Sequence, residues 1–167
     1  KSEAHWKNGK RDGLETHWHE NGSKWYEIHN KNGIKDGLET HWYESGKKKL
    51  ERHYKNGKQE GLETKWSETG EKEFESHTKK NGIEIWTWYK SGKKELERHY
   101  KNGKKEGLET EWFSGEKRFT TNYKNGEYDG LMTSWYKSGK KESEIHYKNG
   151  KQEGLLTRWY ESGEKLY

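Results

Sequence analysis

The 167-residue sequence contains no cysteine and no proline, and only 25% of its residues are hydrophobic. The absence of cysteine excludes disulfide bonds and thiolate metal sites, and it leaves the redox compartment undecided. The absence of proline is compatible with uninterrupted strand pairing, because every residue keeps its backbone N–H donor. No run of about 18 apolar residues is present, so the sequence predicts no membrane-spanning helix.

The apolar residues that are present are mostly large. The sequence has 10 Trp, 11 Tyr and 3 Phe, although 38% of its residues are charged. Disordered chains of such high charge are poor in aromatic residues, and each Trp or Tyr can bury on the order of 150–250 Å². The composition therefore predicts a folded chain that is held together by a few large side chains and not by a two-layered apolar core.

The net charge of +5 comes from 34 basic and 29 acidic residues. The two signs are interspersed throughout the chain, and no block of five like charges occurs. A basic protein that binds nucleic acid or an anionic membrane usually clusters its positive charge. The pattern indicates a solvated surface of mixed charge and argues against nucleic acid or an anionic membrane as the partner.

A unit of 24 residues repeats along the chain. Its clearest copy is KNGIKDGLETHWYESGKKKLERHY at residues 31–54. Self-similarity at a fixed period predicts an array in which each copy contacts mainly its neighbours. We therefore expect one repeat domain over residues 1–167, with copies at residues 7–30, 31–54, 55–78, 79–100 (shortened), 101–123, 124–147 and 148–167 (partial).

Turn-forming pairs recur at fixed places in each copy. In the copy at 31–54 they are Asn32-Gly33, Asp36-Gly37 and Ser45-Gly46. Such pairs supply the left-handed conformations that tight reversals need. The stretches between them, residues 38–44 and 47–54, are long enough for a strand and too short for a helix. The spacing predicts an all-β fold, an elongated antiparallel meander of about fifteen short strands, two for each copy.

The loop at residues 44–46 decides which side chains share a face. A three-residue loop with its glycine in the left-handed position places Trp42 opposite Lys48 and Thr40 opposite Leu50, and gathers the large apolar residues into one stripe. A two-residue type I′ turn shifts the register by one residue and divides them between the faces. We favour the three-residue loop because it makes the apolar stripe continuous.

Eleven aromatic residues recur at two positions of the repeat, and they are the candidate binding residues. In one interpretation they form the minimal core of each copy, packed on leucines and on Lys or Arg stems across the strands. In the other, a sheet of one layer leaves their stripe uncovered, so that it binds a partner. The two interpretations are compatible. The residues are Trp18, Trp42, Trp66, Trp88, Trp112, Trp135, Trp159, Tyr54, Tyr100, Tyr123 and Tyr147.

Metal binding and catalysis lack support in the sequence. Histidines such as His29 and His53 recur, but equivalent strands lie roughly 9.6 Å apart, and zinc needs each ligand nitrogen within about 2.1 Å. Carboxylates such as Glu15 and Glu39 recur in equivalent environments, whereas acid–base catalysis needs two different ones. No phosphate-binding loop, GxSxG or HExxH motif is present. We therefore predict no metal, no cofactor and no enzymatic activity.

The pattern KNGK(R/Q/K)(D/E)G followed by LxTxWY(E/K)(S/N)GK resembles MORN-type repeats, specifically the variant of the YwqK-like antitoxin family. The resemblance covers essentially the whole chain. It implies a twisted antiparallel sheet of a single layer and the binding of protein or lipid, with a cognate toxin as the partner in the bacterial family. The matching glycines are Gly9 with Gly13, Gly33 with Gly37, Gly57 with Gly61, Gly103 with Gly107, Gly126 with Gly130 and Gly150 with Gly154.

These observations together predict a non-enzymatic scaffold or binding protein whose aromatic-lined face docks a protein partner or a second copy of the chain. One alternative is a fibre subunit, because unpaired terminal strands allow end-to-end assembly. Another is glycan binding at a bacterial surface, with Trp and Tyr rings stacked on sugars. The protein would be cytoplasmic if it is YwqK-like, and secreted or cell-surface if the missing initial Met reflects processing.

Overall fold

The computed structural model describes residues 1–78 and 82–166, and every regular element in these residues is a β-strand. The chain separates into two compact units, Lys1–Thr78 and Lys79–Tyr167. Residues 79–81, which begin the shortened copy, lie outside the described residues. The single repeat domain over residues 1–167 therefore stays a prediction. No helix in the described residues is long and apolar enough to cross a membrane.

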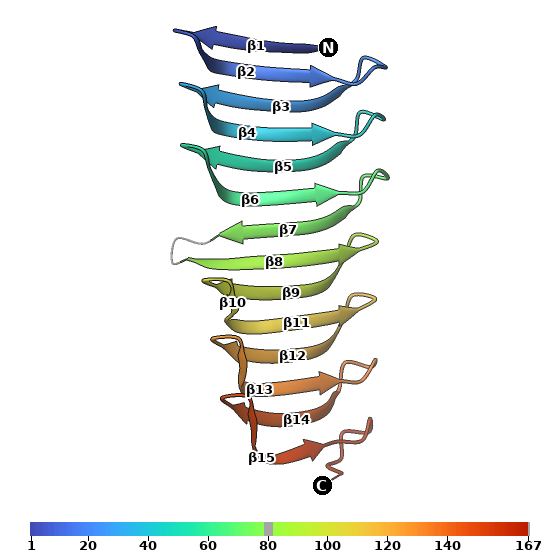
Figure 1. Cartoon of the computed structure of the whole chain (residues 1–167). Coiled ribbons are helices and arrows are strands. Elements are labelled where there is room, and N and C mark those ends of the chain that lie inside the picture. Colours follow the sequence, from blue (N-terminus) through green and yellow to red (C-terminus); the bar gives the residue numbers. More distant parts are fainter. Residues whose placement is uncertain (79–81, 167) are drawn as a thin grey trace. The chain divides into compact units, whose positions relative to one another are not determined.

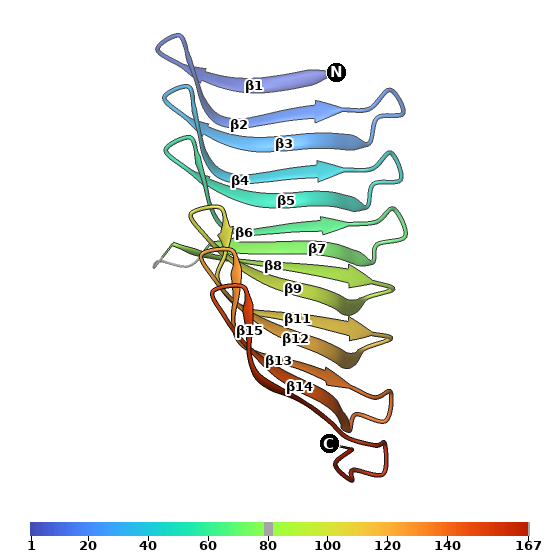
Figure 2. The ribbon, with the colours of Figure 1, turned by 60° about the horizontal axis from the view of Figure 1, so that its bottom comes forward.

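The first unit is a sheet of seven strands that pair in chain order, each antiparallel to the next (Figure 1). The short reversals and the longer loops lie at opposite ends of the strands (Figure 2). The predicted antiparallel meander is confirmed in this unit. Its strands are β1 (Ser2–Lys7), β2 (Lys10–Trp18), β3 (Lys24–Lys31), β4 (Ile34–Trp42), β5 (Lys48–Lys55), β6 (Lys58–Trp66) and β7 (Lys72–Thr78).

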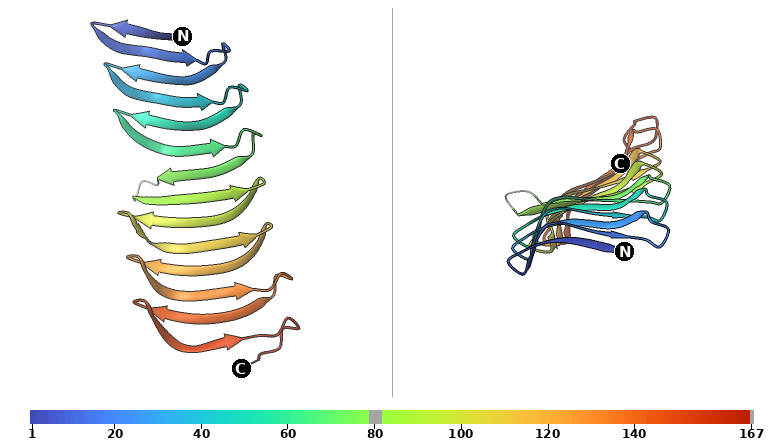
Figure 3. Two further views of the ribbon diagram at one scale, coloured as in Figure 1. Left: turned by 45° about the vertical axis from the view of Figure 1, so that its right-hand side comes forward. Right: turned by 90° about the horizontal axis from the view of Figure 1, so that it is seen from above.

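The second unit repeats this arrangement with eight strands, of which the short β10 pairs with β9 beside β11. Within each unit the described strands lie side by side in one layer (Figure 3). The prediction of an all-β sheet of a single layer is therefore confirmed in both units. The strands are β8 (Ile83–Lys90), β9 (Lys93–Lys101), β10 (Lys104–Lys105), β11 (Gly107–Phe113), β12 (Glu116–Lys124), β13 (Glu127–Trp135), β14 (Lys141–Lys148) and β15 (Lys151–Arg158).

Two kinds of reversal connect the strands. Asn32 and Gly33, with φ of 53° and 84°, form a two-residue turn between β3 and β4, as a type I′ turn requires. The loop between β4 and β5 is longer. The Tyr43 N–H donates to the Lys47 carbonyl at 2.9 Å, and residues 44–46 lie between this bonded pair. Gly46 ends this loop with φ of 81°. The predicted three-residue loop is therefore confirmed.

The Asp36-Gly37 pair does not reverse the chain, and the prediction of a turn there is wrong. Both residues lie inside β4, which begins at Ile34. Gly37 has φ of 133°, and the register with β3 shifts just beside it. A left-handed residue in the middle of a strand bends the strand and does not end it. The second glycine of this pair is therefore a bend position.

We expect Gly37→Ala to lower the free energy of unfolding by about 2–3 kcal/mol. A Cβ at this position would lie 2.9 Å from the His29 Cβ, in addition to the strain of its positive φ. Gly9→Ala is the matched control, because a Cβ there meets nothing within 4 Å. The control carries only the backbone strain, about 1 kcal/mol. Urea unfolding of both variants tests this, and equal losses would contradict it.

The predicted register fails beyond the loop. Trp42 pairs with Lys48 as expected, but Thr40 lies opposite Glu51, and Leu50 lies opposite His41. The extra residue is Lys49, a β-bulge that shifts all of β5 by one position. A shift of one residue moves side chains to the other face of a sheet. The prediction of one continuous apolar stripe is therefore wrong.

The centre of each sheet is built from buried polar side chains. Ile28, with 0% exposure, is the only buried hydrophobic residue among those that the structure describes. Every buried side-chain nitrogen or oxygen in the described residues has a hydrogen-bond partner, so these groups carry no unmet desolvation cost. The buried polar residues are Glu15, Thr16, Asn30, Glu39, Thr40, Glu63, Thr64, Thr87, Glu109, Thr110, Thr120, Thr133 and Ser134.

Candidate functional site

The structure divides the eleven predicted binding residues between two faces. The register of β4 and β5 puts Trp42 on one face and Tyr54 on the other. We call the first the tryptophan face, and in each unit it carries the residues equivalent to Trp42, which are Trp18, Trp42, Trp66, Trp112, Trp135 and Trp159. The other is the tyrosine face, which carries Tyr54, Tyr100, Tyr123 and Tyr147.

Trp88 does not belong with the other predicted tryptophans. The turn after β8 has only two residues, Ser91 and Gly92, with φ of 49° and 71°. Trp88 therefore takes the repeat position of His41 and pairs with Leu96 on the tyrosine face. The prediction that all seven tryptophans form one ladder is wrong, because the sequence spacing to the loop glycine did not allow for a shorter loop.

The tryptophan face is covered by its own lysines. The Lys24 ammonium lies 5.7 Å from the centre of the Trp42 ring and also pairs with Glu27. Glu27 in turn lies opposite Thr40 in the next strand. Each of the six indoles has such a lysine at 5.1–5.8 Å and is half-buried. This geometry is a cation–π contact, and it supports a packing role for these rings.

A buried carboxylate organises the tyrosine face of the first unit. Glu39 is 1% exposed and accepts hydrogen bonds from Lys35, from His41 at 2.8 Å and from Arg52 at 2.7 Å. Burial by itself raises the pKa of Glu39, but the bonds from Lys35, His41 and Arg52 outweigh it and hold the pKa at about 2. Glu39 is therefore ionised at neutral pH, and its charge fixes the surrounding cations.

The four predicted tyrosines also pack within the repeat. Tyr54 lies beneath the Lys35 ammonium at 4.8 Å, and Tyr100 packs against a tryptophan of β8 at 4.8 Å between ring centres. Tyr123 and Tyr147 lie on either side of Tyr128, at 5.1 and 5.4 Å. All four are half-buried. The predicted rings of both sets therefore pack against neighbouring side chains, and the more exposed apolar side chains lie at other positions.

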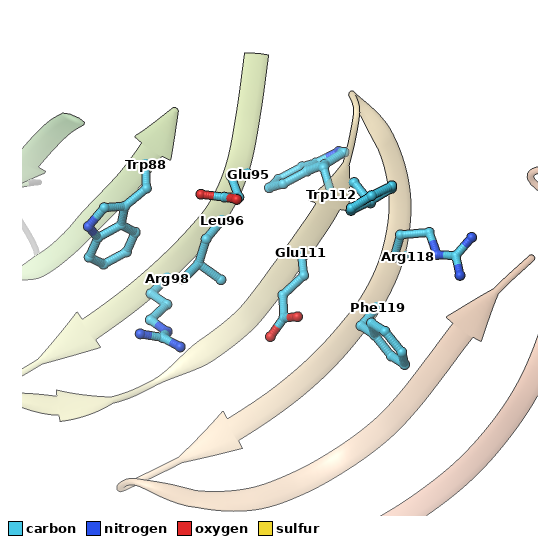
Figure 4. A pocket seen from close by; sticks show the side chains of 9 residues that line it. Trp88, Glu95, Leu96, Arg98, Glu111, Trp112, Arg118 and Phe119 are labelled. Carbon is cyan, nitrogen blue, oxygen red and sulfur yellow. The ribbon is translucent and has the colours of Figure 1, made fainter. Parts of the chain in front are cut away.

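An open hollow of about 730 Å³ lies on the tyrosine face of the second unit (Figure 4). Its walls and floor come from β8, β9, β11 and β12. Phe113 is 68% exposed and Phe119 is 45% exposed, although both are large and apolar. The lining residues are Trp88, Glu95, Leu96, Arg98, Glu111, Trp112, Phe113, Arg118 and Phe119.

Sequence reasoning found Trp88 and Trp112 but missed the rest of this hollow. Phe119 stands where the copy at 31–54 has Leu50, and Glu111 stands where that copy has His41. Phe113 likewise replaces Tyr43. Side chains that depart from the repeat are not required by its common packing. A comparison between the copies, position by position, was the signal that could have found the hollow.

No group of three or more His, Asp or Glu side chains in the described residues is arranged to hold a metal ion. The carboxylates that recur in the repeat, such as Glu15 and Glu39, are instead bonded to cations or amides of the same sheet. A carboxylate that is held in this way acts as a structural counter-ion. The chemistry that the hollow offers is therefore apolar contact, ring stacking and charge.

A family model described as a MORN repeat variant matches residues 11–32, 35–56 and 128–149 of the chain. A comparison with curated proteins gives no match. The chain is thus similar to MORN repeats in three stretches, and the match does not distinguish the YwqK-like antitoxins from other proteins with such repeats. MORN repeats are a non-catalytic repeat type, generally associated with binding or scaffold roles toward proteins or membrane lipids.

Proposed function

We propose that this chain, with its MORN-type repeats, is a non-enzymatic binding protein that docks a partner protein through the hollow on the tyrosine face of its second unit. The observation that carries the proposal is the exposure of Phe113 and Phe119 beside Trp88 and Leu96. Aromatic anchors with charged residues at the rim are typical of protein interfaces. The rest of the repeat array then serves as a scaffold for this surface.

One alternative from the sequence, glycan binding, has less support. Glycan binding through the predicted tryptophan ladder would require free indole faces, but a lysine lies over each of the six on the tryptophan face. Self-association is one form of protein docking, in which a second copy of the chain occupies the hollow. A toxin partner, implied by the resemblance to YwqK-like antitoxins, is a narrower form of the same proposal.

We expect Phe113→Ala to lower the affinity for the partner at least tenfold, because exposed aromatic anchors carry most of the energy of such interfaces. The partner is first captured by a photo-reactive phenylalanine analogue at position 113 and identified by mass spectrometry. Its affinity is then measured by calorimetry with purified proteins. Because Phe113 is 68% exposed, its loss leaves the fold intact.

The matched control is Leu155→Ala, since Leu155 is 91% exposed on β15 and outside the hollow. This variant should bind the partner as tightly as the unchanged chain. The same photo-reactive analogue at position 155 should not capture the partner. If Phe113→Ala binds normally, or if both positions capture the same proteins, the hollow is not the docking surface. Capture of a second copy of the chain at position 113 would assign self-association.

A further inference from the structure

We propose that the hollow receives an arginine side chain of the partner polypeptide, with Glu111 as the counter-ion and Phe119 as the stacking surface. This inference rests on the proposed docking function and adds the chemical class of the group that is recognised. It is carried by the aromatic lining, by two unpaired carboxylates and by the way in which the hollow's own arginines are held.

A continuous row of paired residues forms the hollow. Trp88 lies opposite Leu96, Leu96 opposite Glu111, and Glu111 opposite Phe119. Three strand spacings separate the two aromatic ends of this row, roughly 14 Å. Figure 4 shows Leu96 and Glu111 between the two rings. The hollow thus has aromatic walls and a floor that is apolar on one side and anionic on the other.

Two carboxylates at the hollow lack partners. In the described residues, neither Glu111 nor Glu95 has a hydrogen bond or an ion pair, and both side chains are exposed. The residue equivalent to Glu111 is a histidine bonded within the sheet in the copies at 7–30 and 31–54. His17 bonds to Glu15 at 2.8 Å and His41 bonds to Glu39 at 2.8 Å. Glu111 therefore places a carboxylate where these two copies have a histidine that pairs with one.

The basic residues of the hollow do not neutralise these carboxylates. The Arg98 guanidinium donates to Glu109 and lies 5.6 Å from the centre of the Trp88 ring. Figure 4 shows the Arg118 guanidinium directed away from Glu111. The charge on Glu111 and the exposed ring of Phe119 are thus open to an incoming cation. A cation beside a carboxylate and over an aromatic ring gains both an ion pair and a cation–π contact.

The shape of the site favours arginine over lysine. A guanidinium is planar, stacks on an aromatic face and pairs with a carboxylate through two parallel N–H donors. An ammonium is strongly hydrated and gains less from a ring that is open to water. The chain itself uses this pairing, because Arg52 both bonds to Glu39 and lies 5.4 Å from the Tyr54 ring centre. The occupant is therefore an arginine of a partner segment, with Phe113 in contact with its flanking residues.

The test is a titration of the full chain with N-acetyl-arginine amide, followed by NMR of backbone amides and indole N–H groups. We expect a dissociation constant in the millimolar range, on the order of 1–10 mM, as befits one side chain. The largest shifts should fall on Glu111 and Phe119. N-acetyl-citrulline amide has the same shape without the charge, and it should bind at least about tenfold more weakly. N-acetyl-lysine amide should fall between the two.

Two variants give the test its contrast. Glu111→His restores the residue that the copy at 31–54 has at this position, so it should fold and lose at least about tenfold in affinity for the arginine probe. Glu73→Gln removes the exposed carboxylate that is equivalent to Glu95, at the bulge of β7 in the first unit, and this variant should bind the probe unchanged. Equal binding of the citrulline probe, equal binding by Glu111→His, or shifts confined to other residues would each overturn the inference.

The two proposals fail in different ways. If the arginine probe does not bind while Phe113→Ala still weakens the partner, the hollow is a docking surface for another kind of side chain. If the probe binds at Glu111 while the partner ignores both Phe113→Ala and Glu111→His, the cation site exists but does not serve the proposed docking. Both proposals hold only if Glu111→His also lowers the affinity for the partner. An arginine of the partner must be responsible for this loss.

Discussion

Insertion of one alanine after Lys49 is expected to lower the free energy of unfolding of the first unit by at least about 3 kcal/mol. The substitution Lys49→Ala is expected to change it by less than about 0.5 kcal/mol. Lys49 is exposed, and its ammonium makes only a cation–π contact with Tyr43 at 5.4 Å. The side chain therefore contributes little, whereas an added residue at this position would shift the register of β5.

The large effect of the insertion follows from the pairing of β4 with β5. With one residue more than the single bulge takes up, the register that starts at Trp42 and Lys48 would place Arg52 on the tryptophan face. The buried Glu39 would lose its guanidinium partner, and breaking a buried pair from one side costs about 3–5 kcal/mol. Tyr54 would leave its place beneath Lys35 at the same time. The alternative is to keep these contacts and unpair the end of the hairpin.

Hydrogen exchange on the full chain measures this effect strand by strand. Amides of β4 and β5 should lose protection in the insertion variant and keep it in Lys49→Ala. The strands of the second unit serve as the internal reference in the same experiment. If the insertion and the substitution give the same protection, the number of residues before Leu50 does not set the register and the assignment of the two faces must be revised.

The strands and reversals could be predicted because their signals are local. Asn32 and Gly33 both adopt positive φ, which few other residue pairs tolerate, and Gly46 marks the end of the longer loop in the same way. The bulge carries no such signal, since its position holds residues as different as Trp25, Lys49 and Glu73. Any residue fits there, so its composition reveals nothing.

The wrong face assignment came from the expectation that large apolar residues gather together. In this sheet they do not, because Trp42 is covered by the Lys24 ammonium while Leu50 lies opposite His41. Aromatic rings that pack on lysine stems need no leucine beside them. The alternative register, which divides the large apolar residues between the two faces, was therefore closer to the structure. The two-residue type I′ turn from which that register was derived is nevertheless wrong.

The hollow could not be predicted from the features that the copies share. The rings that the copies share pack against the repeat's own side chains, whereas the exposed Phe113 and Phe119 of the hollow are departures from the repeat. Glu111 is a departure of the same kind. In an array of similar copies, common residues serve the fold that all copies share, while a local function needs residues that only one place has. The candidate site follows from that distinction.

Glu39→Gln is expected to lower the free energy of unfolding by about 2–3 kcal/mol at pH 7, a large loss for a change of one charge. The amide keeps the size of the carboxylate but leaves Lys35 and Arg52 without their buried counter-ion. This expected loss is smaller than the loss for a fully buried ion pair, because the Lys35 and Arg52 side chains are partly exposed. Glu51→Gln on the tryptophan face is the control, since its exposed partner Lys48 makes it a surface pair worth less than about 1 kcal/mol.

The same substitution has a pH signature with a definite sign. The pKa of Glu39 is lowered from 4.5 to about 2 by its three bonded partners. Its contribution is therefore complete above pH 4.5 and is lost as the pH falls through 2, a difference of about 3 kcal/mol. The gap in stability between the unchanged chain and Glu39→Gln should be constant from pH 7 to 5 and should narrow toward pH 2. Urea titrations at each pH measure it, and a gap that stays wide at pH 2 would show that the amide fails for reasons other than charge.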